Sequence, residues 1–292
     1  MNRIGFIGLG AMGSPMVACI ANAGFHLSVF DLQPENTAPL ADLGATVAAS
    51  PAEVAEGADA LVLMVVNAEQ AEDALFGENG AAEKFGPGAA IVLMSTVGPG
   101  PVRELNGRLE QQDLRLLDAP VSGGVARAEK GDLLIMTGGP GDLFVELRPV
   151  LEAMGSTVVH CGESAGDGQS VKLVNQLLCG IHIAAAGEAI AYAEALGLDA
   201  RSVFETIRHG AANSFMLEDR GERMLQEAFL PAKSAMDIFV KDMGLVREAA
   251  SDSGFETPLS DAAHALYSEG SELGMGREDD SGIVRVFQRK DS

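Results

Sequence analysis

The sequence predicts an α/β protein that begins with a doubly wound sheet and ends in helices. Through the first half of the chain, short apolar segments alternate with helical segments, which is the pattern of βαβ units. A glycine-rich run, GFIGLGAMG, includes the end of the first apolar segment, where such folds hold a nucleotide. Beyond about residue 166 the β-rich segments stop and helical patterns follow. We therefore expect an N-terminal Rossmann-type domain, a long interdomain helix and a C-terminal all-α domain.

Seven segments are candidate strands. They are apolar throughout rather than alternating, as expected for parallel strands that helices cover on both faces. Helical segments such as SPMVACIANAG and PAEVAEGADA lie between them. The candidate strands, in chain order, are RIGFIG, FHLSVFD, ALVLMVV, AAIVLMST, LRLLDAPV, DLLIMTGG and STVVHC.

The long helix is expected over about residues 169–196, where Ala, Leu and Ile occur on nearly every side. A helix of that length extends about 42 Å, and its composition predicts burial on most sides. Gly197 is a suitable C-cap residue. The predicted domains are residues 1–165 for the nucleotide, 166–196 for the connecting helix and 197–292 for the helical domain, which closes with a short tail, VRVFQRKDS.

Composition narrows the class of protein. With 47% hydrophobic and 21% charged residues, the chain resembles a compact globular protein. A formal net charge of −22 argues against nucleic acid and anionic membranes as partners. Three cysteines, an odd number, within predicted regular elements indicate reduced thiols. No uninterrupted apolar run reaches the roughly 18 residues of a membrane span. We expect a soluble, cytoplasmic protein.

The glycine-rich run predicts a dinucleotide site. Gly8 is suited to the tight turn, Gly10 to close approach of the backbone to the pyrophosphate, and Gly13 to close helix packing. Asp31 follows the second strand, 18 residues beyond Gly13, where a carboxylate binds the ribose hydroxyls and repels a 2′-phosphate. No Arg or Lys occurs in the ten residues after Asp31. These features together favour a dinucleotide site over an ordinary tight turn beside a solvated aspartate. They also favour NAD over NADP as its ligand.

Lys172 is the candidate acid/base. It is one of six lysines and lies inside the apolar helix QSVKLVNQLLCGIHIAAAGEA, where burial disfavours the charged form of a lysine. Asn175 and Gln176, three and four residues on, share its helical face. A buried lysine beside amide side chains is suited to proton transfer with an alcohol. The alternative is a lysine whose stem packs on apolar surface and whose charge reaches solvent.

A second cluster, DAPVSGG, follows a strand and should lie at the carboxyl edge of the sheet. Ser122, Gly123 and Gly124 offer a hydroxyl and backbone N–H groups to a carboxylate, although an ordinary glycine-rich turn is the alternative. Thr96 ends another strand at the same edge and is placed to face a nicotinamide. Lys241 lies in FVKDMGLV, and this segment taken alone predicts an ordinary surface lysine.

Other chemistries fit badly. Tyr192 and Tyr267 each lack a lysine four residues later, which excludes the Tyr-xxx-Lys pair of short-chain dehydrogenases. The five histidines have no usual metal-ligand spacing. We expect no metal site.

At these motifs the chain resembles the β-hydroxyacid dehydrogenases. The resemblance covers essentially the whole chain and rests on FIGLGAMG, STVGP, DAPVSGG with ARAEKGDL, GQSVKLVNQ and KDMGL, in the family's order. It departs from the family at Val17 and Cys19, where a small residue and Asn or His are usual. Both positions fall within a helix and bear on packing more than on chemistry.

The resemblance implies roles for the candidate residues. Lys172 becomes the catalytic acid/base, with Asn175 and Gln176 orienting the substrate. The substrate carboxylate is bound by Ser122, Gly123 and Gly124. The residues implied at the cofactor are Gly8, Leu9, Gly10, Met12, Gly13, Asp31, Thr96 and Lys241.

Within the family, NQLLCGIHIAAAGEA and ANSFML look most like L-threonate dehydrogenases. His182 lies about 20° from Asn175 around the helix and is a candidate for binding a substrate hydroxyl; a buried packing histidine is the alternative. The implied function is oxidation of L-threonate at C2 to the 2-oxo acid, by a homodimer or homotetramer. Alternatives are 3-hydroxyisobutyrate or tartronate semialdehyde chemistry, and a non-catalytic interaction module, which the retention of Lys172 disfavours.

Overall fold

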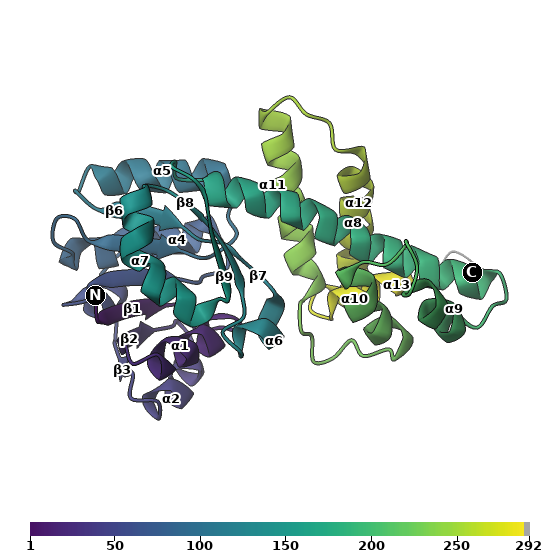
Figure 1. Ribbon diagram of the computed structural model, residues 1–292, viewed down its shortest axis with the longest axis horizontal. Helices are drawn as coiled ribbons and strands as arrows, with labels where there is room; N and C mark the ends of the chain where they lie inside the picture. Colours follow the sequence, from purple (N-terminus) through teal and green to yellow (C-terminus); the bar gives the residue numbers. More distant parts are fainter. Residues whose placement is uncertain (289–292) are drawn as a thin grey trace. The chain divides into compact units, whose positions relative to one another are not determined.

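The computed structural model describes residues 1–288 and divides into two compact units, Met1–Lys172 and a second unit that begins at Leu173. The boundary lies inside α8 (Asp167–Ala195), so the long helix belongs partly to each unit (Figure 1). It begins two residues before the expected position. Gly197 has φ +73° and donates its N–H to the carbonyl of Glu194, which confirms the expected C-cap.

The first unit contains one nine-stranded sheet, and every predicted strand is present. Six strands run parallel in the order β3-β2-β1-β4-β5-β6, with β8 antiparallel to β6 and flanked by β7 and β9. The segment LRLLDAPV forms two strands, β6 and β7, and the short β3 was not expected. The strands are β1 Arg3–Ile7, β2 His26–Phe30, β3 Thr46–Val47, β4 Ala60–Leu63, β5 Ala90–Leu93, β6 Arg115–Asp118, β7 Val121–Ser122, β8 Leu134–Gly138 and β9 Thr157–Gly162.

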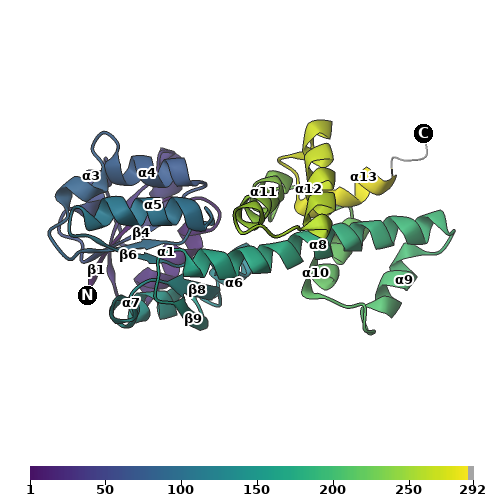
Figure 2. The same ribbon diagram turned by 90° about the horizontal axis from the view of Figure 1, so that it is seen from above.

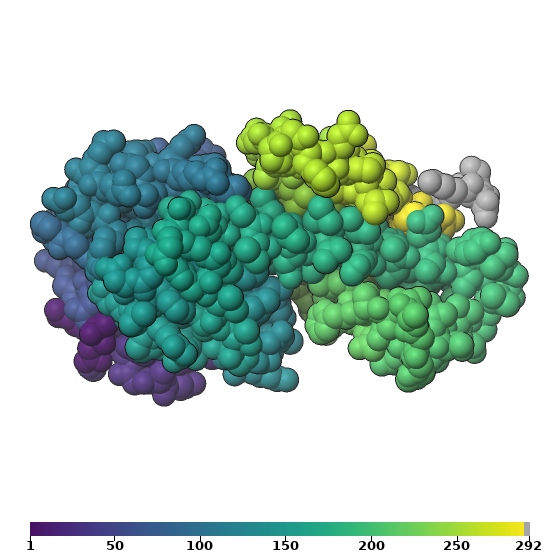
Figure 3. Space-filling model, turned by 45° about the horizontal axis from the view of Figure 1, so that its top comes forward, coloured from purple at the N-terminus to yellow at the C-terminus, as the bar shows by residue number. Residues whose placement is uncertain are grey.

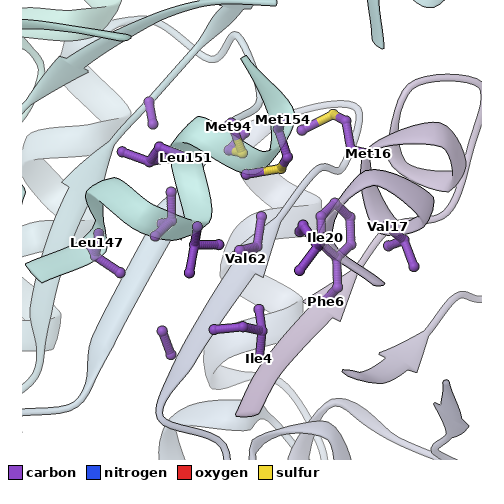
Figure 4. Packing of buried hydrophobic residues seen from close by; sticks show 14 of the residues in the cluster. Ile4, Phe6, Met16, Val17, Ile20, Val62, Met94, Leu147, Leu151 and Met154 are labelled. Atoms are coloured by element: carbon purple, nitrogen blue, oxygen red, sulfur yellow. The ribbon is translucent and has the colours of Figure 1, made fainter. Parts of the chain in front are cut away.

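Helices cover both faces of this sheet, as the uninterrupted apolar strands predict. Figure 2 shows α3, α4 and α5 on one side of the strands and α1 and α7 on the other. Figure 4 shows the side chains of α1, α7 and the strands packed together in one of the two cores. The helices are α1 Gly13–Asn22, α2 Pro34–Ala41, α3 Pro51–Ala55, α4 Ala68–Phe76, η1 Ala81–Lys84, α5 Pro99–Glu110, α6 Gly124–Ala128 and α7 Gly141–Met154.

The second unit is all helical and packs around α8. Gly180 lets α11 approach closely, because a Cβ there would lie 2.2 Å from the sulfur of Met243. The hydroxyl of Tyr267 is fully buried and donates to the carbonyl of Gly180. The elements after α8 are α9 Ala200–Ile207, α10 Phe215–Leu225, α11 Met236–Asp252, α12 Pro258–Gly270, η2 Ser271–Met275, η3 Asp280–Ile283 and α13 Val284–Gln288.

The predicted C-terminal tail was wrong over residues 284–288. These residues form α13, and Val284 and Val286 are buried in the core of the second unit. Residues 289–292, the rest of the predicted tail, lie outside the described part of the chain.

The predicted burial of α8 on most sides holds only in part. Ile183 and Ile190 are buried in the core of the second unit, but Val174, Leu178 and Tyr192 are 64%, 49% and 63% exposed. Part of the helix is visible at the molecular surface, coloured teal to green, in Figure 3. By length and composition alone α8 is long and apolar enough to cross a membrane, although its buried residues are those of a core helix.

A buried carboxylate holds the start of α8 against the sheet. Asp118, the last residue of β6, is fully buried; one carboxylate oxygen accepts the N–H of Gly166 at 2.6 Å and the other that of Gln169 at 2.8 Å. Space there is tight, because a Cβ on Gly138 or Gly168 would lie 2.7 Å from the carboxylate. Burial raises the pKa of Asp118 from 3.8 to about 6, although the two N–H donors oppose that shift.

Asp118 should therefore make the protein more stable as the pH falls from 7 to 5. Its pKa is raised in the folded state, so the folded protein holds a proton at pH 5 that the unfolded chain releases. This stabilisation is complete below the unfolded-state pKa and is lost as the pH rises through about 6, a change of about 1 kcal/mol between pH 7 and 5. Urea titrations of the wild type and Asp118→Asn at both pH values measure it. A difference in unfolding free energy that does not change with pH contradicts the prediction.

Candidate active site

The glycine loop has the geometry that a dinucleotide requires. Gly8 has φ +96°, and a Cβ there would lie 2.4 Å from the carbonyl oxygen of Met64. A Cβ on Gly13 would lie 1.9 Å from the carbonyl oxygen of Gly8, so α1 can begin this close to the strand only at glycine. At Gly10 a Cβ would meet no described atom within 4 Å. The start of α1 therefore offers backbone N–H groups and a helix dipole beside open space, which suits a pyrophosphate.

Asp31 connects the glycine loop to the end of β2. One carboxylate oxygen accepts the N–H of Leu9 at 2.6 Å, and the other accepts from the backbone of Gln33 and the side chain of Asn36. A carboxylate has about four acceptor sites, so these three bonds leave capacity for a ribose hydroxyl. Asp31 is thus both a fixed support of the loop and a candidate ribose ligand. The support role was not anticipated from the sequence.

The loop that contains Thr96 is held by a residue that the sequence did not single out. Gln169, in the first turn of α8, accepts the N–H groups of Val97 and Gly98 and donates to the carbonyl of Ser95. Thr96 is half-buried between these contacts, just beyond β5. Because β5 and β6 are parallel neighbours, this loop and Asp118 lie at the same carboxyl edge of the sheet. Its position, about one helical turn before Lys172, was the feature of the sequence that could have identified Gln169.

The residues of the DAPVSGG run have two different roles. One supports α8, and the others form a candidate surface for a ligand. Asp118 is buried and anchors α8, as described above. Ser122 ends β7 and is half-buried, and Gly123 and Gly124 follow it with φ +133° and +67°. These positive angles require glycine. The run therefore turns the chain sharply and presents backbone groups at Gly124, where a Cβ would meet no described atom within 4 Å.

Lys172 lies in the second turn of α8, three residues after Gln169, and only 6% of it is exposed. Asn175 and Gln176 follow on the same face of this uninterrupted helix. Because Asp118 and Gln169 bind the first turn to the carboxyl edge of the sheet, Lys172 is held close to that edge. A nearly buried amine there is suited to proton transfer.

In the second unit, a chain of polar side chains joins three of the predicted residues. Asn175 donates to Gln176 at 2.9 Å, and Gln176 donates to the buried carboxylate of Asp242. The other oxygen of Asp242 lies 2.9 Å from Nζ of Lys241. Lys241 is therefore half-buried and ion-paired rather than a solvated surface lysine. Asp242 was missed, although its place beside Lys241 in the KDMG run was visible in the sequence.

His182 is half-buried on α8. Among residues 1–288, no group of three or more His, Cys, Asp or Glu side chains converges as a metal site. All three cysteines are free thiols. Cys19, one of the departures from the family pattern, donates to the carbonyl of Ala128 and so contributes to packing.

Two family models together match most of the chain. Residues 3–162 match the family model of the NAD binding domain of 6-phosphogluconate dehydrogenase. Residues 166–287 match the model described as NAD-binding of NADP-dependent 3-hydroxyisobutyrate dehydrogenase. The two matches meet near the start of α8.

Curated relatives and solved structures agree with these matches. L-threonate dehydrogenase of Cupriavidus necator is 44% identical over 98% of this chain and 96% of its own. The Escherichia coli K12 enzyme of the same name is 39% identical over 98% and 94%. The crystal structure of a 3-hydroxyisobutyrate dehydrogenase from Salmonella typhimurium, 38% identical, has a TM-score of 0.91 and covers 98% of this chain and 100% of that one. The chain therefore belongs to the β-hydroxyacid dehydrogenases, NAD(P)-dependent oxidoreductases that act on small hydroxy acids.

Proposed function

We propose that the protein is an NAD-dependent L-threonate dehydrogenase that oxidises C2 to the 2-oxo acid. The observation that carries the dehydrogenase chemistry is the nearly buried Lys172 on a helix fixed to the cofactor edge of the sheet. The choice of L-threonate is supported by near full-length relatives of that name at 38–44% identity. A cytoplasmic location accords with three free thiols.

Each candidate residue has a role in this reaction. Bound NAD would supply the acceptor for the hydride that leaves the carbinol carbon. Lys172 takes the hydroxyl proton as general base and returns it in the reverse direction. Asn175 and Gln176 orient the substrate hydroxyls. The backbone and hydroxyl of Ser122–Gly124 hold the substrate carboxylate, which restricts the substrate to one orientation.

The preference for NAD is supported by charge. Asp31 places a carboxylate where NADP would carry its 2′-phosphate. From residue 4 to residue 83 the chain contains no Lys or Arg and 11 Asp or Glu. The glycine loop and Asp31 lie in this segment, so a second phosphate would meet repulsion from Asp31 that no cation of the segment offsets. The pyrophosphate is held by the N–H groups and dipole of α1.

A second candidate substrate is 3-hydroxyisobutyrate, which is favoured by the name of the Salmonella typhimurium structure. Its reaction uses the same proton transfer and carboxylate contacts but oxidises a primary alcohol. The two substrates differ in a hydroxyl that His182 is proposed to bind.

Self-association through α8 is also proposed. Val171, Val174, Leu178 and Tyr192 are all exposed apolar residues of this helix at helical spacing. Exposed apolar side chains on one face of a helix are candidates for an interaction site. A second copy of the chain is the expected partner, in a homodimer or homotetramer.

Lys172→Ala should lower kcat by at least about 100-fold, the low end for general acid–base catalysis, with little change in NAD affinity. Initial rates with L-threonate and NADH fluorescence titration measure the two quantities. Lys84→Ala, a matched change at an exposed lysine, should leave both unchanged. Turnover within tenfold of the wild type would remove Lys172 from the mechanism.

Replacing Asp31 with Ser and Leu32 with Arg should raise kcat/KM for NADP relative to NAD, because a phosphate partner replaces a repelling carboxylate. Affinity for NAD should fall as well, since the Leu9 N–H loses its acceptor. The control is Leu32→Arg alone, which keeps Asp31 and should keep the preference for NAD. A wild type that already prefers NADP contradicts this assignment of Asp31.

His182→Leu should reduce kcat/KM for L-threonate by roughly 10–100-fold, the effect of losing a buried hydrogen bond to the substrate. Activity on 3-hydroxyisobutyrate should change far less, because that acid has no hydroxyl at the matching carbon. Ile183→Val, a packing change on the same helix, should lower the melting temperature without changing the substrate ratio. If His182→Leu behaves like this control, His182 is a packing residue. If the wild type does not oxidise L-threonate, the assignment of L-threonate as substrate is wrong.

A further inference from the structure

One buried side chain joins the loop that carries Thr96 to the helix that carries Lys172. Gln169 is fully buried, and its carbonyl oxygen accepts two backbone N–H groups, from Val97 at 3.0 Å and Gly98 at 3.1 Å. Its amide nitrogen donates to the carbonyl of Ser95 at 2.9 Å. The bonds fall on both sides of Thr96, so the side chain fixes the path of the loop before and after that residue.

Other contacts make the loop and the first turn of α8 a single body. The backbone N–H of Gln169 is itself bound by Asp118, which fixes the glutamine to the sheet. Gly166, just before the helix, packs so closely that a Cβ there would lie 3.1 Å from the carbonyl oxygen of Pro99. Lys172 is only three residues, or about 4.5 Å of helix rise, beyond Gln169. A shift of the loop is therefore transmitted to Lys172 within one helical turn.

We infer that Gln169 is a positioning residue that sets the placement of Lys172 relative to the Thr96 loop, and hence of the proton acceptor relative to the cofactor. This inference rests on the proposed roles of Lys172 and Thr96. Proton and hydride must leave the same carbinol group, so both acceptors have to be placed within a few tenths of an ångström. A side chain that binds both supports provides that constraint.

Gln169→Met keeps the side-chain volume and removes all three bonds. We expect kcat with L-threonate to fall by about 10-fold or more and the NADH dissociation constant to rise by only a few fold, because the acceptors are displaced while the glycine loop is untouched. Hydrogen exchange reports on the contact without any catalysis. The amides of Val97 and Gly98 should exchange faster, whereas the amide of Met94, bound to Leu63, should not.

Gln169→Glu provides a signature that a general loss of stability does not. A protonated glutamic acid reproduces glutamine, since its carbonyl accepts from the two N–H groups and its hydroxyl donates to Ser95. The carboxylate cannot donate to the carbonyl of Ser95. The ratio of kcat in Gln169→Glu to that in the wild type should therefore rise at least several fold as the pH falls from 8 to 6. Taking the ratio removes the titration of common groups that do not interact with residue 169; Asp118, which binds its backbone N–H, is coupled to it and titrates with it.

Thr137→Val is the matched control, because Thr137 is fully buried in the same unit and the change removes its one side-chain hydrogen bond, to the carbonyl of Val159. It should lower the melting temperature and leave kcat unchanged. If Gln169→Met exchanges faster at Val97 and Gly98 but keeps kcat within about threefold, or if the Gln169→Glu ratio is independent of pH, the positioning role is overturned. Failure of the proposed function is recognised separately, by full activity in Lys172→Ala.

Discussion

The carboxylate of Asp118 is the constraint on which the candidate site depends. Burying a carboxylate is expensive unless donors surround it, and here the donors are the N–H groups of Gly166 and Gln169. They are among the N–H groups at a helix start that have no partner within the helix. The carboxylate at the end of β6 and the N–H groups at the start of α8 are therefore each other's hydrogen-bond partners. Gly138 and Gly168 have no side chains and leave room for this contact. The placement of α8 then determines that of Lys172.

The glycine-loop part of the proposed cofactor site offers backbone N–H groups rather than cations. The loop from Gly8 to Gly13 presents N–H groups, and Asp31 holds that loop through the N–H of Leu9. In this segment, which contains no Lys or Arg, the proposed dinucleotide would be bound through helix-terminal dipoles and hydrogen bonds. Asp31 supports the loop, and in the proposed site the same carboxylate would disfavour a 2′-phosphate.

In the second unit, Asp242 is another buried carboxylate that joins two elements. Its buried carboxylate accepts from Gln176 on α8 and pairs with Lys241 on α11. Asn175 joins through Gln176. Residues that the family resemblance assigns to substrate and to cofactor are therefore connected by one carboxylate. Buried networks of this kind hold side chains in defined rotamers when every member has a partner, as a site for a small, hydroxyl-rich acid requires.

The sequence by itself determined the sheet, the long helix and the glycine loop, because these depend on local periodicity and on glycines at set spacings. It also singled out Lys172, since a lysine within an apolar helix is conspicuous. Only the tertiary structure decided what Asp118, Gln169 and Asp242 do, because each binds groups that are 48 to 74 residues away in the chain. The short helix α13 was missed for the same reason: its two valines are buried by distant segments. Hydrogen bonds between distant segments produce no periodic pattern in the sequence. The roles of Asp118, Gln169 and Asp242 could therefore not be predicted before the fold was known.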